Sequence, residues 1–333
     1  MAMEPTAKLQ KAKFQQLKLQ KSVMLTAYNR IKRIAFGRQG NDGLVFKLFV
    51  YALLISVGFV YLYPILYLVS QSFKSLNDLL DPTVLWIPQK LYFQNFVQAW
   101  HVLNYMDTFW NSVLNSVVPA VGQTISCAVV GYGLAKFRFP GKSIIFALMM
   151  ITFIVPSQVV MIPLYLMFND YHMLGSPLPF IIPTIFGQGI KGVLFILIYM
   201  QFFRTIPTSL EEAAQMDGAG FIRTFFTVIL PISTPAIVVV MLFSTVWHWN
   251  ETYLTSLYLG DSMTTLPLML KTFNDSFSKL YGGGAAVGGK HQNINESIRM
   301  AGTLLIVLPL LILYLFAQKR FVEVVDKTGI TGE

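Results

Sequence analysis

The side chains that most often perform chemistry in proteins are few and scattered in this sequence. Its histidines are His101, His172, His248 and His291. Their spacing matches neither H-E-x-x-H nor any other close metal-binding pattern. The single cysteine, Cys127, can form neither an intrachain disulfide nor a cysteine metal cluster. No G-x-S-x-G motif or evident pair of carboxylates is found, so we expect no catalytic residue, no metal site and no enzymatic activity.

One stretch has the spacing of a nucleotide-binding loop. Residues 284–290 read G-x-x-x-x-G-K. His291 stands where such a loop needs a Ser or Thr hydroxyl for magnesium, and no strand pattern precedes it. We therefore expect this chain to bind no nucleotide or other cofactor.

A polar segment at residues 204–223 has the residue types of a short capped helix. Thr208 and Ser209 are both helix-capping residues. Glu211 and Glu212 follow them by three positions, which is the spacing of a capping box. The segment therefore predicts a short helix that begins at one of these two hydroxyl residues.

The predicted helix covers about residues 209–217 and is suited to docking. Ala213 and Ala214 give it a small-residue face. Gly218 and Gly220 can end it or allow another backbone to approach closely. A short helix with these features is shaped to fit against another protein.

A second candidate site consists of polar and aromatic residues within or beside apolar segments. Lys191, near Gln188, either lines a wet cavity or extends its side chain to a membrane interface. Further along, aromatic rings alternate with hydrogen-bonding groups, which suits sugar binding and is equally typical of an interfacial aromatic belt. This later group is Trp247, Trp249, Asn250, Glu251 and Tyr253.

The elements that must position these residues are transmembrane helices. The chain has 333 residues, of which 54% are hydrophobic and only 12% are charged, too few to cover a soluble globule. Windows free of charge and long enough to cross a bilayer lie at 48–73, 108–135, 143–169, 224–250 and 300–318. A sixth, at 181–203, is interrupted by Lys191. We predict an all-α, integral membrane bundle of six transmembrane helices.

The distribution of basic residues predicts the orientation. With six spans, 18 Lys and Arg residues lie on the side of both termini and six lie on the other side. The positive-inside rule therefore places both termini in the cytoplasm. The basic residues follow no nucleic-acid-binding motif, so the lipid bilayer rather than nucleic acid is the expected partner.

These boundaries divide the chain into three predicted parts. Residues 1–47 form a basic cytoplasmic tail, 48–318 a six-helix transmembrane domain and 319–333 a cytoplasmic C-terminal tail. Within the first tail, residues 9–36 suit either an amphipathic helix on the anionic inner leaflet or a partly disordered segment. The Gly-rich residues 282–289 predict a flexible loop.

The 204–223 segment and the span after it resemble the EAA loop of ABC importer permeases. The likeness rests on the run Glu212 to Ala214, on Gly218 after three intervening residues, and on Val228 to Pro231 after nine more intervening residues. In that family this loop is a coupling helix that sits in a cleft of the ATPase subunit. The resemblance implies that Glu212 contacts the ATPase and that Gly218 permits a tight turn. The implied coupling residues are Glu211, Glu212, Ala213, Ala214, Asp217 and Gly218.

Residues 131–142, 201–207, 247–259 and the C-terminus resemble the carbohydrate branch, the maltose-type permeases, and in particular its smaller permease partner. This implies a type I ABC importer permease fold in the plasma (inner) membrane of a prokaryote. It also implies a second homologous permease, two ATPase subunits that bind ATP and magnesium, an extracytoplasmic substrate-binding protein and a carbohydrate substrate such as an oligosaccharide. The resemblance assigns no role to the N-terminal tail or to residues 282–290.

An ion-coupled secondary transporter is the alternative interpretation. It would need titratable or ion-binding groups at mid-membrane. Only Lys191 approaches that requirement. The sequence does not identify the sugar, and it leaves open whether this subunit contacts it.

Overall fold

The computed structural model describes residues 43–282 and 294–329, and these residues fold into helices joined by loops. The chain divides into two compact units, residues 1–67 and 68–333, and each is described by itself. The predicted helix or tail at 9–36 and most of the Gly-rich loop lie outside the described residues.

In the first unit the structure describes most of one helix, α2 (Leu44–Ser72). The last residues of this helix belong to the second unit. Its 29 residues correspond to about 43 Å, enough to cross a bilayer core. Almost all of its side chains within the first unit are exposed, and most of them are apolar. The predicted span at 48–73 is therefore confirmed as a continuous helix.

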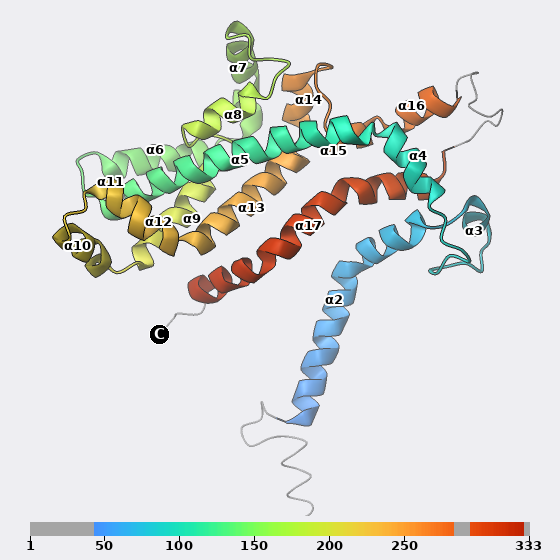
Figure 1. Cartoon of the computed structure of the whole chain (residues 1–333), viewed down its shortest axis with the longest axis horizontal. Helices are drawn as coiled ribbons and strands as arrows, with labels where there is room; N and C mark the ends of the chain where they lie inside the picture. The colour runs from blue at the N-terminus through green and yellow to red at the C-terminus, as the bar shows by residue number, and fades with distance from the viewer. Residues whose placement is uncertain (1–42, 283–293, 330–333) are drawn as a thin grey trace, which may run out of the picture. The chain divides into compact units, whose positions relative to one another are not determined.

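The second unit is built around one long helix, α5 (Tyr105–Lys136), which confirms the predicted span at 108–135. It packs against α4 (Gln94–Val102), α8 (Leu178–Ile185), α9 (Gly192–Thr205) and α13 (Thr234–Asn250). A further helix, α17 (Glu296–Gly329), packs in turn on α13 and α4 (Figure 1). The apolar part of α17 covers the predicted span at 300–318, and the helix continues to Gly329.

A glycine sets the distance between α5 and α9. A Cβ atom on Gly131 would lie 2.7 Å from Cβ of Tyr199 and 3.2 Å from the backbone oxygen of Ile196. Only a residue without a side chain fits at such a contact. The close approach buries Tyr199, Phe195 and the neighbouring apolar side chains in one core cluster.

The predicted span at 143–169 is wrong as a single straight helix. It forms α6 (Lys142–Ile154) and α7 (Ser157–Asp170), which meet at an angle of 97°. The break is at Val155 and Pro156, both of which are extended. Proline has no N–H to donate and disfavours helical dihedrals in the residue before it, so the helix ends there.

The predicted span at 181–203 is also wrong as one helix. It divides into α8 and α9, and a loop of residues 186–191 separates them. Gly187, Gly189 and Lys191 in this loop all have positive φ angles, of 75°, 152° and 59°. Such dihedrals cannot continue a right-handed helix. The helix is therefore interrupted by the backbone conformation of these three residues and not only by the charge of Lys191.

The predicted span at 224–250 bends as well. It begins with α11 (Phe221–Thr224), a π-helical turn (Phe225–Ile229) and α12 (Leu230–Ile232), and then turns by 78° into α13. Ser233 lies at the bend, and its hydroxyl donates to the Ile229 carbonyl over 2.6 Å. Pro231 and Pro235 on either side restrict the backbone and explain the bend.

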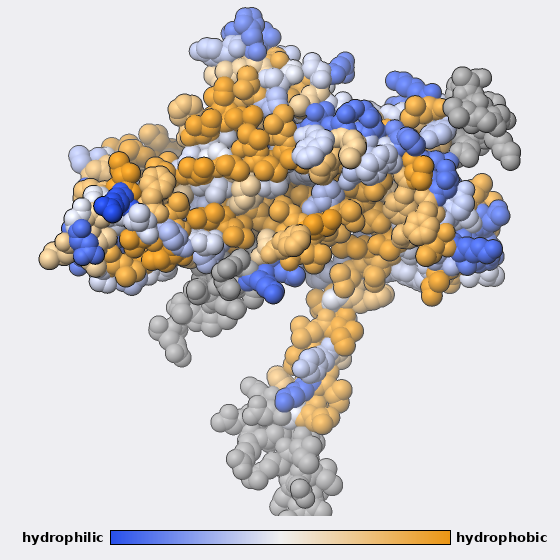
Figure 2. Space-filling model, in the orientation of Figure 1, coloured by the Kyte–Doolittle hydropathy of each residue, from blue (hydrophilic) through white to orange (hydrophobic). Residues whose placement is uncertain are grey.

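The remaining elements are short: α3 (Leu76–Leu80), α10 (Thr208–Met216), α14 (Tyr253–Leu259), α15 (Leu266–Lys271), α16 (Phe273–Phe277) and a π-helical turn (Ser278–Gly282). Within the described residues, three helices are individually long and apolar enough to cross a membrane, or up to six spans if each bent pair counts once. Figure 2 shows hydrophobic side chains over most of the visible face of the second unit and hydrophilic ones near α3 and the tip of α7. This agrees with the predicted all-α membrane bundle.

Candidate functional site

The first candidate site is the short helix α10. It spans Thr208–Met216, close to the predicted residues 209–217. The predicted capping box is wrong, because Pro207 is the N-cap residue and no side chain caps the first turn. The helix ends at Asp217, and Gly218 follows with φ of +79°. Because this left-handed dihedral favours glycine, Gly218 provides the turn out of the helix.

Glu211 takes part in an ion pair rather than in a cap. Its Oε1 lies 2.9 Å from Nζ of Lys136, the last residue of α5, and these side chains are only 14% and 9% exposed. Lys136 Nζ also donates a hydrogen bond to the carbonyl of Ile206, the C-cap residue of α9, over 2.7 Å. One lysine therefore joins the start of α10 to the ends of α5 and α9. Sequence reasoning assigned no role to Lys136, although it lies in the 131–142 stretch that resembles the maltose-type permeases.

Most of the remaining surface of α10 is open. None of its nine residues is buried, and Glu212, Ala213 and Asp217 are exposed, while Ala214 is half-buried. Apolar side chains beside them are also open: Met216 is 88% exposed, and Ile222 on α11 is 78% exposed. The structure thus separates the two glutamates, with Glu211 held inward by Lys136 and Glu212 presented outward.

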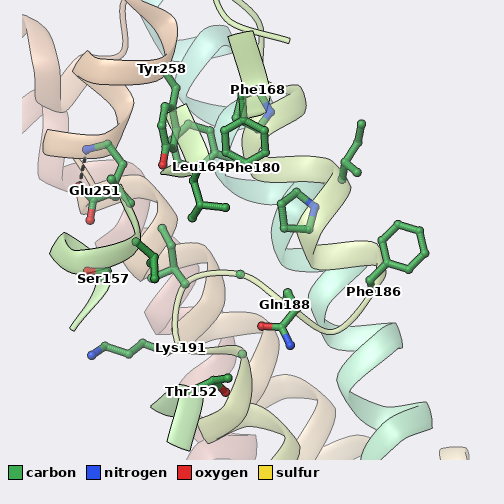
Figure 3. Close-up of a pocket in the computed structure, with 18 of the residues that line it drawn as sticks. Thr152, Ser157, Leu164, Phe168, Phe180, Phe186, Gln188, Lys191, Glu251 and Tyr258 are labelled. Carbon is green, nitrogen blue, oxygen red and sulfur yellow. Dashed lines mark hydrogen bonds between the residues drawn. The ribbon is translucent and has the colours of Figure 1, made fainter. Parts of the chain in front are cut away.

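The second candidate site is a cavity of about 1020 Å³ in the second unit. Its walls come from the bend between α6 and α7, from α8 and the loop after it, and from the end of α13 and the start of α14 (Figure 3). Three of the predicted pathway residues, Gln188, Lys191 and Glu251, line this cavity. The breaks that interrupt the predicted spans are the features that form the walls.

The other four residues predicted for the pathway lie elsewhere. Trp247 packs between Phe195 and Phe243, with ring centroids 5.3 and 5.8 Å away. Trp249 is buried in a separate core cluster. Asn250 donates to the carbonyl of Val246 over 2.9 Å on its own helix. Tyr253 is an exposed residue of α14 outside the lining of the cavity.

The cavity has an aromatic end and a polar end (Figure 3). At the aromatic end, the ring centroid of Tyr258 lies 5.2 Å from that of Phe168 and 5.6 Å from that of Phe180. Gln188 and Lys191 lie apart from these rings, on the loop after α8 (Figure 3). The three rings are each only 4% exposed and pack together in a core cluster, whereas Gln188 and Lys191 are exposed and offer hydrogen-bonding groups.

Glu251 lies at the start of α14, on the cavity wall. Its Oε1 accepts hydrogen bonds from the backbone N–H groups of Tyr253 and Leu254, each over 2.9 Å. The carboxylate therefore stabilises the first turn of α14, where backbone donors lack helical partners. Among the described residues, no group of three or more His, Cys, Asp or Glu side chains could hold a metal ion.

Comparison with known proteins identifies the type of protein. Residues 128–326 match the family described as "Binding-protein-dependent transport system inner membrane component". The chain is 29% identical over 270 residues to the diacetylchitobiose uptake system permease protein NgcG of Streptomyces coelicolor, covering 81% of this chain and 84% of that one. It is 27% identical over 297 residues to the arabinooligosaccharides transport system permease protein AraQ of Bacillus subtilis, covering 86% of this chain and 97% of the relative.

A solved structure shows the same fold. It is the crystal structure of a bacterial ABC transporter involved in the import of the acidic polysaccharide alginate, matched with a TM-score of 0.64 and 23% identity. The match covers 83% of this chain and 96% of that one. At this identity the likeness concerns the fold, which is that of an ABC importer permease. The matched family covers more than half of the chain and extends from α5 into α17. The chain therefore belongs to the inner membrane components of binding-protein-dependent transport systems, as a non-catalytic permease subunit.

Proposed function

We propose that this chain is a transmembrane permease subunit of an ATP-driven importer that translocates a carbohydrate, such as an oligosaccharide. Its partners in this proposal are a second homologous permease, two ATPase subunits that bind ATP and magnesium, and an extracytoplasmic substrate-binding protein. Family membership and the permease relatives support the transport role. The chain itself binds no cofactor and performs no hydrolysis.

The observation that carries the proposal is the open surface of α10. The helix is short, ends at a left-handed glycine, has no buried residue, and stands beside the exposed apolar side chains of Met216 and Ile222. Exposed apolar side chains next to an acidic residue suit the contact surface of another protein. In our proposal this surface, with Glu212 at its centre, contacts an ATPase subunit.

The proposed contact has a mechanical connection to the membrane helices. The ion pair between Glu211 and Lys136 ties α10 to α5, and the hydrogen bond from Lys136 to Ile206 ties it to α9. A displacement of α10 by an ATPase would therefore act on two helices of the bundle. Alternating access would follow from rigid-body movement of the two permeases.

A carbohydrate substrate is supported by the relatives and by the cavity. The names of two relatives specify diacetylchitobiose and arabinooligosaccharides. On the cavity wall, Gln188, Lys191 and Glu251 provide groups that can hydrogen-bond to sugar hydroxyls. We assign these three residues to the substrate pathway and leave Trp247, Trp249, Asn250 and Tyr253 outside it.

The orientation follows from the charges. With α10 and both termini in the cytoplasm, 18 basic residues face the cytoplasm and six face outward. The chain would then be a multi-pass protein of the prokaryotic plasma membrane. The side opposite α10 would receive the substrate from the binding protein.

The first experiment is a mild-detergent purification of the chain from its native membrane. Mass identification of copurifying subunits should recover an ATPase and a second permease, and ATP hydrolysis should rise when the liganded binding protein is added. A chain that emerges alone, under conditions that preserve other complexes, would contradict the proposal and favour an ion-coupled transporter.

The second experiment reverses the charge of Glu212. Glu212→Lys should abolish ATP-dependent uptake while leaving the chain folded, because the side chain is exposed. Asp275→Lys is the matched control, since Asp275 is an exposed acidic residue on α16 rather than on α10. Normal uptake by Glu212→Lys would show that the coupling assignment is wrong.

A further inference from the structure

Lys191 is a charged residue at the depth of the middle of the bundle. The carbonyl of its neighbour Ile190 accepts a hydrogen bond from Nε2 of Gln123 over 3.0 Å, and the carbonyl of Gly192 lies 3.6 Å from Sγ of Cys127. Gln123 and Cys127 both belong to α5, near the middle of its apolar span at 108–135. Because Lys191 stands between their two contacts, it lies close to mid-membrane depth.

The lengths of the neighbouring helices agree with this depth. From Lys191, α9 continues for 14 residues, about 21 Å, to the end of the bundle where Lys136 donates to the carbonyl of Ile206. In the other direction, α5 begins at Tyr105, about 27 Å along the helix from Gln123. The sequence left open whether Lys191 extends to a membrane interface or lines a wet cavity, and its depth favours the cavity.

The ammonium group of Lys191 has no counter-charge in the part of the chain that the structure describes. The side chain is exposed, lines the cavity and extends from the loop after α8 (Figure 3). The ion pairs found among the described residues join Lys136 to Glu211 and Arg299 to Glu296, and neither involves Lys191. A charged side chain within a membrane bundle faces a wet cavity and pairs with an opposite charge.

The acidic residue on the cavity wall is already engaged elsewhere. Oε1 of Glu251 accepts hydrogen bonds from the backbone N–H groups of Tyr253 and Leu254, each over 2.9 Å. These donors at the start of α14 compensate part of the carboxylate charge. Lys191 is therefore the unpaired charge among the described residues of this cavity, and its complement is an anionic group.

The loop that carries Lys191 is closely packed, so the charge is held in a fixed place. A Cβ atom on Gly189 would lie 2.7 Å from Cγ2 of Thr184, and one on Gly192 would lie 2.6 Å from the carbonyl oxygen of Gly187. Lys191 itself has a left-handed φ of 59°, which is uncommon for a residue other than glycine. Such conformations persist where the surrounding structure enforces them, and they concentrate at binding sites.

We infer that the transported carbohydrate is acidic and that the ammonium group of Lys191 pairs with its carboxylate or phosphate group. This inference rests on the proposed function and names the class of carbohydrate within it. An ammonium group is a point charge with three donors, so it can bind either anion. The exposed Gln188 on the same loop offers hydrogen bonds to neighbouring hydroxyls. A neutral sugar in this cavity would leave the ammonium group without a counter-charge.

Two substitutions test the charge at this position. Lys191→Met removes the charge with an unbranched side chain of similar length, and Lys191→Arg keeps the charge. For an acidic substrate, we expect Lys191→Met to lower kcat/KM for uptake about ten- to a hundredfold, the effect of losing a hydrogen bond between charged groups, and Lys191→Arg to retain most of it. The matched control is Lys271→Met, which removes an exposed lysine on α15 outside the cavity and should leave kcat/KM unchanged.

The assay is ATP-dependent uptake by the complete transporter in proteoliposomes, with its binding protein. Trigalacturonate provides a carboxylate, trehalose 6-phosphate provides a phosphate, and maltotriose and diacetylchitobiose are neutral probes. The same binding protein serves the wild type and the variants, so its own preference cancels in their comparison. Uptake of an acidic probe, with a loss in Lys191→Met that spares the neutral probes, would support the inference, and the probe taken up would identify the anionic group.

The other outcomes separate this inference from the proposed function. Uptake of neutral probes alone would overturn the inference and leave the proposed function standing. An acidic probe that Lys191→Met transports as well as the wild type does would also overturn it. An equal loss for acidic and neutral probes would do the same, because Lys191 would then pair with a carboxylate of the second permease. A wild type that takes up no probe with ATP would count against the proposed function itself.

Chemical modification gives a readout that does not depend on transport. Acetic anhydride should acetylate Lys191 in the purified transporter with its binding protein, and an acidic probe should slow this reaction whereas maltotriose should not. The exposed Lys90 and Lys271 should be acetylated at rates that no probe changes, as mass spectrometry of their peptides would show. A Lys191 that is never acetylated, or is acetylated equally with and without both acidic probes, would overturn the inference whatever the uptake result.

Discussion

The ion pair between Lys136 and Glu211 allows a quantitative test of how α10 is held. The perturbation is Glu211→Gln, which removes the charge and keeps the size of the side chain. Both side chains are mostly buried, at 9% and 14% exposure, so the usual value of less than about 1 kcal/mol for a surface pair does not apply. Removing one partner of a buried pair costs about 3 to 5 kcal/mol, because the other charge remains uncompensated.

Two features place the expected value at the lower end of that range. Lys136 keeps its hydrogen bond to the Ile206 carbonyl, and its residual exposure allows some contact with water. We therefore expect Glu211→Gln to lower the free energy of unfolding by about 3 kcal/mol, or the melting temperature by roughly 5 to 10 °C. Tryptophan fluorescence during thermal unfolding of the detergent-purified chain measures this change.

Matched variants determine whether the pair itself is responsible. Glu212→Gln removes an exposed carboxylate one residue away and should change the melting temperature by less than about 1 °C, since substitutions of exposed residues have small effects. Lys136→Met should be as harmful as Glu211→Gln, whereas the double variant should recover part of the loss because it leaves no unpaired charge. Additive effects of the two single substitutions would refute the reasoning.

Two further predictions concern the close contact between α5 and α9 and the hydrogen bonds that hold the loop before α4. Gly131→Ala should destabilise the bundle by about 1 to 3 kcal/mol, because the new Cβ would lie 2.7 Å from Cβ of Tyr199. Gly133→Ala, with no neighbour within 4 Å of its Cβ position, should leave the melting temperature unchanged or raise it, and similar losses for both variants would contradict the packing argument. Asn95→Ala should speed proteolysis of the loop before α4, because the buried Asn95 side chain donates to the carbonyls of Ser72 and Lys74 over 2.9 and 2.8 Å. The control Gln94→Ala, at an exposed position, should be cleaved at the wild-type rate, and equal cleavage of the two variants would count against this role.

The continuous spans could be predicted because their determinants are local. An apolar stretch of about 20 residues without charge has to form a helix in a bilayer, where each backbone group needs an internal partner. The helices α2, α5 and α17 follow this rule, and α17 extends beyond its predicted span to Gly329. The turn at Gly218 was also predictable, since glycine is the residue that readily adopts its left-handed conformation.

The broken spans at 143–169 and 181–203 were predicted as single helices because apolar composition hides the breaks. Proline and glycine within an apolar segment are compatible with a straight, kinked or fully interrupted helix. Which one forms depends on partners elsewhere in the chain. The loop before α9, for example, is held through Ile190 by Gln123, which is 67 residues earlier in the sequence.

The sequence by itself determined the class of protein: its apolar windows specify a membrane bundle, and residues 212–231 resemble the EAA loop of ABC importer permeases. Only the tertiary structure decided which glutamate of α10 is held by Lys136 and which is free for a partner. It likewise decided which polar residues line the cavity. The reason is physical. Membrane insertion depends on the composition of contiguous segments, whereas ion pairs, hydrogen-bond networks and cavities depend on side chains that meet only when distant segments pack together.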